Sequence, residues 1–135
     1  TDDDLQDFDM LGSGRVRTTY WNERPAEFQK ALDAGVSHAS WAEVSVANFV
    51  SPKADEMYLQ VSATAGSSNN VRLRAKDYTP TGASGTNTTQ IQVAANMTQF
   101  NVVWMNCGGT KAFEHYHDNA SSRLTATMRA FRETL

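Results

Sequence analysis

From Trp41 to the C-terminus, apolar and polar residues alternate with a period of two. The clearest run places Met57, Leu59, Val61 and Ala63 at every second position. The other apolar sets with this spacing are Val44 and Val46; Val71, Leu73 and Ala75; Ile91, Val93 and Ala95; Phe100, Val102 and Trp104; and Leu124, Ala126, Met128 and Ala130. Successive side chains of a β-strand point to opposite faces, so this alternation predicts strands with one face buried in a core.

The breaks between these runs have the composition of turns. They are rich in Gly, Pro, Ser and Asn, and they fall at 51–52, 66–70, 79–87, 106–110 and 119–122. These residue types favour turns, because Gly and Asn tolerate positive φ and Pro cannot donate to a sheet. About eight short strands with frequent turns are typical of antiparallel sandwiches. The predicted fold class is therefore all-β, an antiparallel β-sandwich of jelly-roll type.

Residues 1–37 have a different pattern from the sandwich, which we place at 38–135. Five of the first nine residues are Asp, and only Leu5 and Phe8 among them are apolar. Such a stretch repels itself and has no face to bury, which predicts an extended N-terminal arm that is flexible or ordered only on a partner. A frayed terminus is the alternative. Residues 15–21, which follow the flexible sequence Gly-Ser-Gly at 12–14, are predicted to form a short strand.

Residues 24–35 carry the signals of one short helix. Pro25 suits a first helical position and Gly35 suits the residue after a helix end. Phe28 and Leu32 are four residues apart and would share one face of that helix. Because it would have only about two and a half turns, such a helix needs to pack on the sandwich to persist.

Composition narrows the possible partners. The chain of 135 residues is 40% hydrophobic, which is enough for one folded domain. Twelve Lys and Arg against 15 Asp and Glu argue against nucleic acid as the main partner. No apolar run approaches the roughly 18–20 residues of a membrane-spanning helix, so we expect no membrane insertion. A first residue of Thr is what removal of an initiator Met would leave, and we expect a nearly complete gene product.

The segment from Trp41 to Ala63 resembles a known family. It reads Trp-Ala-Glu-Val-Ser-Val-Ala-Asn-Phe-Val-Ser-Pro-Lys-Ala at 41–54 and Met-Tyr-Leu-Gln-Val-Ser-Ala at 57–63, followed by strands at 71–74 and 124–131. This layout resembles the β-sandwich proteins of bacteriophage virion surfaces, of capsid-decoration, head-fibre and tail-fibre-tip type. The resemblance covers roughly residues 38–132. It departs from the family at Pro52, which is displaced by one position, and at Phe131, near which the family often has a Gly-Tyr pair.

The resemblance implies a non-enzymatic structural protein located on the virion. Such proteins are often homotrimers that bind virion proteins such as the major capsid protein, so we expect a capsid decoration or cementing subunit, or a fibre subunit, without a cofactor. The alternative is a carbohydrate-binding receptor-recognition module of a tail-fibre tip that contacts a host-surface glycan. We expect the docking residues in the arm and in the strand after it: Asp2, Asp3, Asp4, Leu5, Phe8, Arg15 and Arg17.

One motif carries possible metal chemistry. In a strand, His115 and His117 would share a face, and two imidazoles at that spacing can bind Zn²⁺, most readily where copies meet on a threefold axis. The alternative, which we favour, is that they are surface or interface histidines hydrogen-bonded to Glu114 or Asp118. A thiol nucleophile at Cys107 lacks any known signature, and a lone Cys is more often simply buried.

Two further sets of side chains suggest binding surfaces. Arg72, Arg74 and Lys76 would form a basic row on one strand face, which either binds an acidic partner or is an ordinary solvated face. Aromatic rings can stack on sugars. We predict that Trp41 and Trp104 belong to the core, and that the better candidates for an exposed sugar platform are Tyr20, Trp21 and Tyr78.

Overall fold

The computed structural model describes residues 4–12, 14–22, 29–76 and 88–134. These residues form ten β-strands and no helix, so no helix among them is long and apolar enough to cross a membrane. The strands are β1 (Asp4–Met10), β2 (Val16–Asn22), β3 (Lys30–Gly35), β4 (Ala42–Ser45), β5 (Glu56–Thr64), β6 (Asn69–Ala75), β7 (Thr88–Val93), β8 (Thr98–Asn106), β9 (Ala112–His117) and β10 (Arg123–Thr134).

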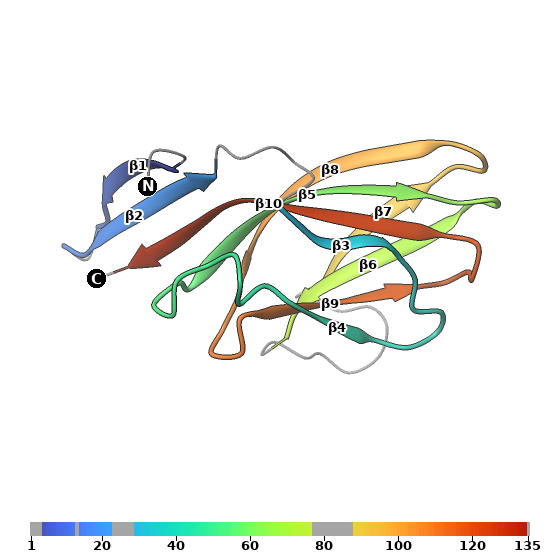
Figure 1. Ribbon diagram of the computed structural model, residues 1–135. Helices are drawn as coiled ribbons and strands as arrows, with labels where there is room; N and C mark the ends of the chain where they lie inside the picture. The colour runs from blue at the N-terminus through green and yellow to red at the C-terminus, as the bar shows by residue number, and fades with distance from the viewer. Residues whose placement is uncertain (1–3, 13, 23–28, 77–87, 135) are drawn as a thin grey trace.

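The strands build two antiparallel sheets that face each other. The six-stranded sheet has the order β1-β2-β10-β5-β8, with β3 also paired to β10, and the four-stranded sheet has the order β4-β9-β6-β7. Apolar side chains from both sheets form one core, in which the largest fully buried residues include Met57, Leu59, Leu73, Ile91, Phe113 and Leu124. The predicted all-β sandwich is therefore confirmed (Figure 1).

The alternation predicts the buried face of β5 correctly. Met57, Leu59, Val61 and Ala63 are all buried, while the intervening side chains are half-buried or exposed. In β10, Leu124, Ala126 and Met128 are buried at every second position, although Thr127 between them is buried as well; after Met128 the register against β5 shifts. Bulges of this kind bend a strand and reverse which side chains point inward.

The helix expected over residues 24–35 is wrong for the residues that the structure describes, 29–35; Phe28 lies outside the described residues. Residues 30–35 form β3, which lies against one edge of β10 with two register shifts. The backbone N–H of Met128 donates to the Gln29 carbonyl at 2.9 Å, and that of Ala34 donates to Thr125 Oγ1 at 3.0 Å. A short helix would leave these sheet groups without partners, and Leu32 packs on the core from the strand as well as it would from a helix.

The acidic stretch is also more regular than expected. Instead of an extended arm, residues 4–10 form β1, which pairs with β2 along all seven of its residues; β2 in turn pairs with the last part of β10. The strand expected over residues 15–21 is confirmed as β2. The division of the chain into residues 1–37 and 38–135 stays a prediction, although β1, β2 and β3 share a sheet with β5.

β8 faces the opposite way from the prediction. Val103 and Met105 stand opposite Leu59 and Met57 and pack on the core. Phe100, Val102 and Trp104 therefore point to the outer face of the six-stranded sheet. The sequence of β8 has apolar residues at both parities, so alternation alone does not decide which set is buried.

Candidate functional site

One end of the molecule is a sheet with a single layer. β1, β2 and residues 130–134 of β10, which we call the hairpin extension, lie beyond the body formed by the two sheets (Figure 1). The side chains of Phe8 and Met10 are 67% and 74% exposed, and they lie opposite Thr18 and Val16 in the register. Two large apolar side chains exposed on neighbouring positions of one face mark a surface suited to binding another protein.

The other face of the hairpin extension is tied together by polar contacts. Arg17 forms an ion pair with Asp9 at 3.0 Å, and the Trp21 indole N–H donates to Asp7 at 2.7 Å. Arg132 donates from Nε to Thr19 Oγ1 at 3.2 Å. These contacts hold β1 and β2 on the sheet and leave the Phe8 face for other contacts.

The residues predicted to dock on a partner differ in where they lie on the hairpin extension and in how exposed they are. Asp2 and Asp3 lie outside the described residues, and Asp4 and Leu5 begin β1, opposite Asn22 and Trp21. Phe8 is exposed as an apolar anchor would be. Arg15 is exposed beside β2, whereas Arg17 is engaged by Asp9. Met10 is the residue that the sequence analysis missed; its place two positions after Phe8 in a strand is the signal that would have found it.

At the opposite end of the sandwich, three turns lie close together: residues 65–68, 94–97 and 118–122 (Figure 1). We call this the loop end. Asn119 Nδ2 donates to Ser67 Oγ at 2.9 Å, and the Gly66 N–H donates to Ser121 Oγ at 3.3 Å. These bonds join the first and third turns into one surface.

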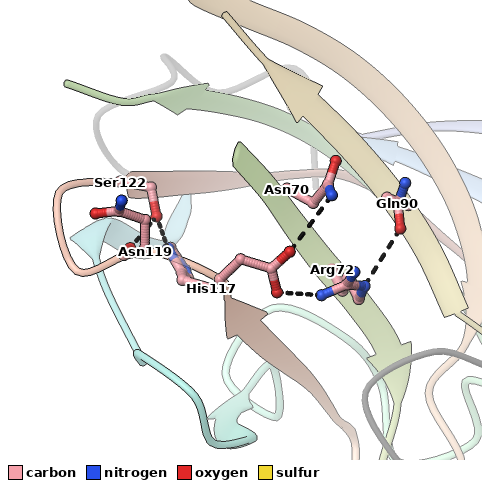
Figure 2. Close-up of polar contacts among 7 residues, drawn as sticks. Asn70, Arg72, Gln90, His117, Asn119 and Ser122 are labelled. Atoms are coloured by element: carbon pink, nitrogen blue, oxygen red, sulfur yellow. Dashed lines mark hydrogen bonds and ion pairs between the residues drawn. The ribbon is translucent and has the colours of Figure 1, made fainter. Parts of the chain in front are cut away.

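Beside these turns lies a polar network on the outer face of the four-stranded sheet. Asp118 accepts hydrogen bonds from Arg72 and, at 3.4 Å, from Asn70 (Figure 2). Arg72 also donates from Nε to Gln90 Oε1 at 3.3 Å. The network neutralises its own charges, so the surface that it presents is polar and not strongly basic.

A hollow of about 550 Å³ adjoins this network. We call it the amide hollow; its lining residues are Ser68, Asn69, Asn70, Gln92, Val93, Ala94 and Gln99. The carbonyl oxygen of the Asn69 side chain is buried and has no hydrogen-bond partner among the described residues. Amide side chains both donate and accept hydrogen bonds, which suits an uncharged ligand with many hydroxyl groups.

His115 and His117 share a face as predicted, but they are buried between the sheets and do not lie on the surface. Glu114 and Asp118 do not bond them; those carboxylates bind Arg74 and Arg72 on the other side of the sheet. His115 Nδ1 lies 2.8 Å from His117 Nε2. No group of three or more His, Cys, Asp or Glu in the described part of the chain is arranged to hold a metal ion.

His115, His117 and Ser122 form a buried series of hydrogen bonds, and Ser122 determines where the hydrogens lie in it. The Ser122 hydroxyl donates to the Asn119 carbonyl at 2.9 Å, so Ser122 Oγ must accept from His117 Nδ1–H at 2.6 Å. His117 Nε2 then has to accept from His115 Nδ1–H. Burial, reinforced by His115 and Arg123, lowers the pKa of His117 to about 4, and burial lowers the pKa of His115.

The basic row is paired within the chain. Arg74 Nε donates to Glu114 at 2.8 Å, and Lys76 lies 3.6 Å from Glu43. The Arg74 guanidinium also covers the ring of Trp41 at 4.0 Å. Trp41 therefore belongs to the outer face of the four-stranded sheet, and the prediction that it lies in the core is wrong.

The remaining candidates are engaged by neighbours. Tyr20 stacks on Phe131, and Trp21 meets Tyr58 and Trp104 edge-on, so neither ring is a free platform for a sugar; Tyr78 lies outside the described residues. Trp104 belongs to this outer aromatic cluster and not to the core. Cys107 is buried, and burial raises the pKa of its thiol, which makes it a poor nucleophile.

Neither a known protein family nor a curated protein matches this sequence. Among solved structures, the chain is similar to the coat protein of Tobacco streak virus. The two are 11% identical, the alignment covers 93% of this chain and 89% of that chain, and the TM-score is 0.44.

Proposed function

We propose that the protein is a non-enzymatic structural subunit of a bacteriophage virion, bound to the particle through the hairpin extension. The observation that carries this proposal is the exposure of Phe8 and Met10 on a single layer of sheet. Apolar side chains on such a layer gain about 25 cal/mol for each Å² that a partner covers. The body of the sandwich and its loop end would then project from the particle.

We also propose that the sandwich is a jelly roll, the architecture found in viral capsid and lectin domains. The strand pairing supports this, because β3 pairs with β10, β4 with β9, β5 with β8 and β6 with β7. One long hairpin gives this nested pairing when it is rolled up so that its strands alternate between two sheets. This architecture and the resemblance of residues 38–132 to phage surface proteins point to the same class of protein, by analogy of fold.

Within that class, we propose a capsid decoration or cementing subunit in preference to a fibre subunit. The partners would be further copies of the chain, as a homotrimer, and the major capsid protein. Residues 1–37 would supply the docking part and residues 38–135 the displayed part. The hydrogen bond that Asp7 accepts from Trp21 and the ion pair of Asp9 with Arg17 support this assignment, because they hold the docking strand in a defined shape.

The substitution Phe8→Asp tests the docking proposal. Removing an apolar anchor from a protein interface costs 2 kcal/mol or more, so we expect about 30-fold weaker binding to particles, measured as occupancy after sedimentation. Because Phe8 is exposed, the thermal midpoint of the isolated protein should stay within a few degrees of the wild type. Val36→Asp, at an exposed apolar residue outside the hairpin, is the matched control. Full occupancy of the Phe8→Asp protein would show that docking uses another surface.

A second candidate function is a carbohydrate-binding module, which the amide hollow favours. Its uncharged polar lining and the unpartnered Asn69 oxygen suit a neutral host-surface glycan. If the hollow binds sugar, Gln92→Ala should weaken binding to neutral oligosaccharides on a glycan array by about tenfold, the value of one hydrogen bond. Asn48→Ala, at an exposed amide far from the hollow, should have no effect. If the wild-type protein binds no glycan, the carbohydrate-binding function is excluded and only the structural role remains.

A further inference from the structure

One long part of the sequence carries no charge. Between Asp77 and Lys111, from Tyr78 to Thr110, there is no Asp, Glu, Lys, Arg or His, although 20% of the whole chain is Asp, Glu, Lys or Arg. This stretch includes β7 and β8, which are the edge strands of the two sheets and are joined by a short turn. Depletion of charge is the compositional mark of the central part of a protein interface.

The outer face of β8 exposes apolar side chains. Phe100 is 64% exposed and Val102 is 58% exposed, and Met97 is exposed in the turn before the strand. They stand opposite Ser62 and Gln60 of β5, whose small or polar side chains do not cover them. Trp104 lies on the same face, where it stacks on Tyr58 at 4.6 Å and is covered by the Arg132 guanidinium at 3.6 Å, so the exposed apolar part of the strip is Phe100 and Val102.

The two edges of the six-stranded sheet differ in how they are protected. β1, at one edge, carries Asp4, Asp7 and Asp9, and charged residues on an edge strand discourage pairing with other strands. β8, at the other edge, has nine residues without charge or proline, and no described strand pairs with its second side. An edge of this kind pairs readily with another strand.

We propose that β8 is the surface through which two copies of this chain contact each other. A charged partner would lose solvation against this strip without gaining an ion pair, whereas a second β8 is itself uncharged and apolar. In an antiparallel contact centred on Val102, each Val102 faces its counterpart and Phe100 lies opposite Trp104. Two β1 strands would instead bring Asp residues together, so the sequence selects β8 for this contact.

The inference goes beyond the proposed function: a two-fold β8 contact joins chains in pairs and is separate from the contacts of the proposed homotrimer, and it does not depend on docking to a particle. It is tested on the isolated protein, whereas the Phe8→Asp test needs particles. A chain that is monomeric in solution and still occupies particles would therefore remove the β8 contact and leave the docking proposal in place. A chain that associates in solution but does not occupy particles would instead remove the docking proposal and leave the β8 contact.

The experiment is light scattering of the isolated protein over a range of concentrations. Because the two-fold β8 contact joins chains in pairs, we expect the wild type to have the mass of an even number of chains, the smallest being twice 14.9 kDa. Val102→Lys should weaken the association by about a hundredfold or more, because two ammonium groups would meet at the contact. Val36→Lys, at an exposed valine away from β8, should behave like the wild type. A wild type that is monomeric at every concentration, or a Val102→Lys protein with an unchanged mass, would overturn the proposal.

A second variant guards against a Val102→Lys protein that does not fold. Val102→Cys is a small change at an exposed position, and the native Cys107 is buried. Under mild oxidation the variant should form a disulfide-linked dimer, because the two Val102 positions face each other in the proposed contact. Covalent dimers that are absent, or no more abundant than for Val36→Cys, would contradict it.

Discussion

Acidification from pH 7 to pH 5 is expected to lower the free energy of unfolding by about 2 kcal/mol through His117 alone. The pKa of His117 is about 4 in the folded protein, against 6.5 for an unperturbed histidine. Each pKa unit corresponds to about 1.4 kcal/mol, and the loss is complete only below pH 4. The unfolded chain binds the proton first, so this contribution to stability is fully present above pH 6.5 and decreases as the pH falls. His115, whose pKa is also lowered, adds to the loss in the same direction.

The geometry of the buried histidines explains why protonating His117 destabilises the folded protein. Protonating His117 at Nε2 directs an N–H at the N–H of His115, so His115 has to change tautomer. If both rings are protonated, two cations lie side by side between the sheets. The neighbouring carboxylates do not neutralise them, because Glu114 and Asp118 bind arginines on the other face, and the nearby Arg123 adds a further positive charge.

Urea unfolding at pH 7, 6 and 5 measures this effect. Replacing the titrating ring in His117→Phe should flatten the dependence on pH, at the expense of some stability at pH 7. His38→Gln, at an exposed position, is the control for the loss of a histidine. Equal slopes for the wild type and His117→Phe would show that other groups control the response to acid.

The substitution Glu114→Leu is expected to cost about 3 kcal/mol of stability. Glu114 and Arg74 are both buried on the outer face of the four-stranded sheet, and Glu114 accepts from Arg74 Nε at 2.8 Å. Without the carboxylate, the guanidinium stays over the ring of Trp41 and loses the hydrogen bond to a buried counter-charge. Lys76, 3.9 Å from Glu114, loses a weaker contact at the same time.

The double variant Arg74→Met/Glu114→Leu separates charge burial from packing. Apolar side chains of similar size often replace a buried ion pair without loss, so most of the stability should return. The exposed pair of Asp9 and Arg17 supplies the control, since Asp9→Asn should cost no more than about 1 kcal/mol. Urea unfolding at pH 7 gives all three values. A Glu114→Leu protein as stable as the wild type would mean that Arg74 finds sufficient solvent or other partners.

Much of the secondary structure is determined by the sequence itself. The strands around Leu59, Leu73 and Leu124 were predicted correctly because alternation is a local property, and a strand with one buried face requires it. For the same reason, His115 and His117 share a face, as Arg72 and Arg74 do. Local pattern also placed β2, although it did not indicate what β2 would pair with.

The tertiary structure decided which segments pair as strands and which face of each strand is buried, neither of which follows from a period of two. Residues 30–35 became a strand because β10, almost a hundred residues away, offers an edge with unpaired backbone groups. The acidic stretch became β1 because β2 provides seven pairing positions for it. In β8 both parities contain apolar residues, and only pairing with β5 fixed Val103 inside and Val102 outside.

The candidate binding surfaces also depend partly on local sequence and partly on tertiary contacts. Phe8 was recognisable from the sequence, because an apolar residue among aspartates has nothing nearby to pack against. The burial of His115 and His117, the pairing of the basic row and the amide hollow depend on strands that meet only in the folded chain. A sequence thus determines which side chains share a face of a strand. Which face is buried, and what lies opposite it, depends on contacts between residues far apart in the chain, because those contacts exclude the water and supply the hydrogen-bond partners.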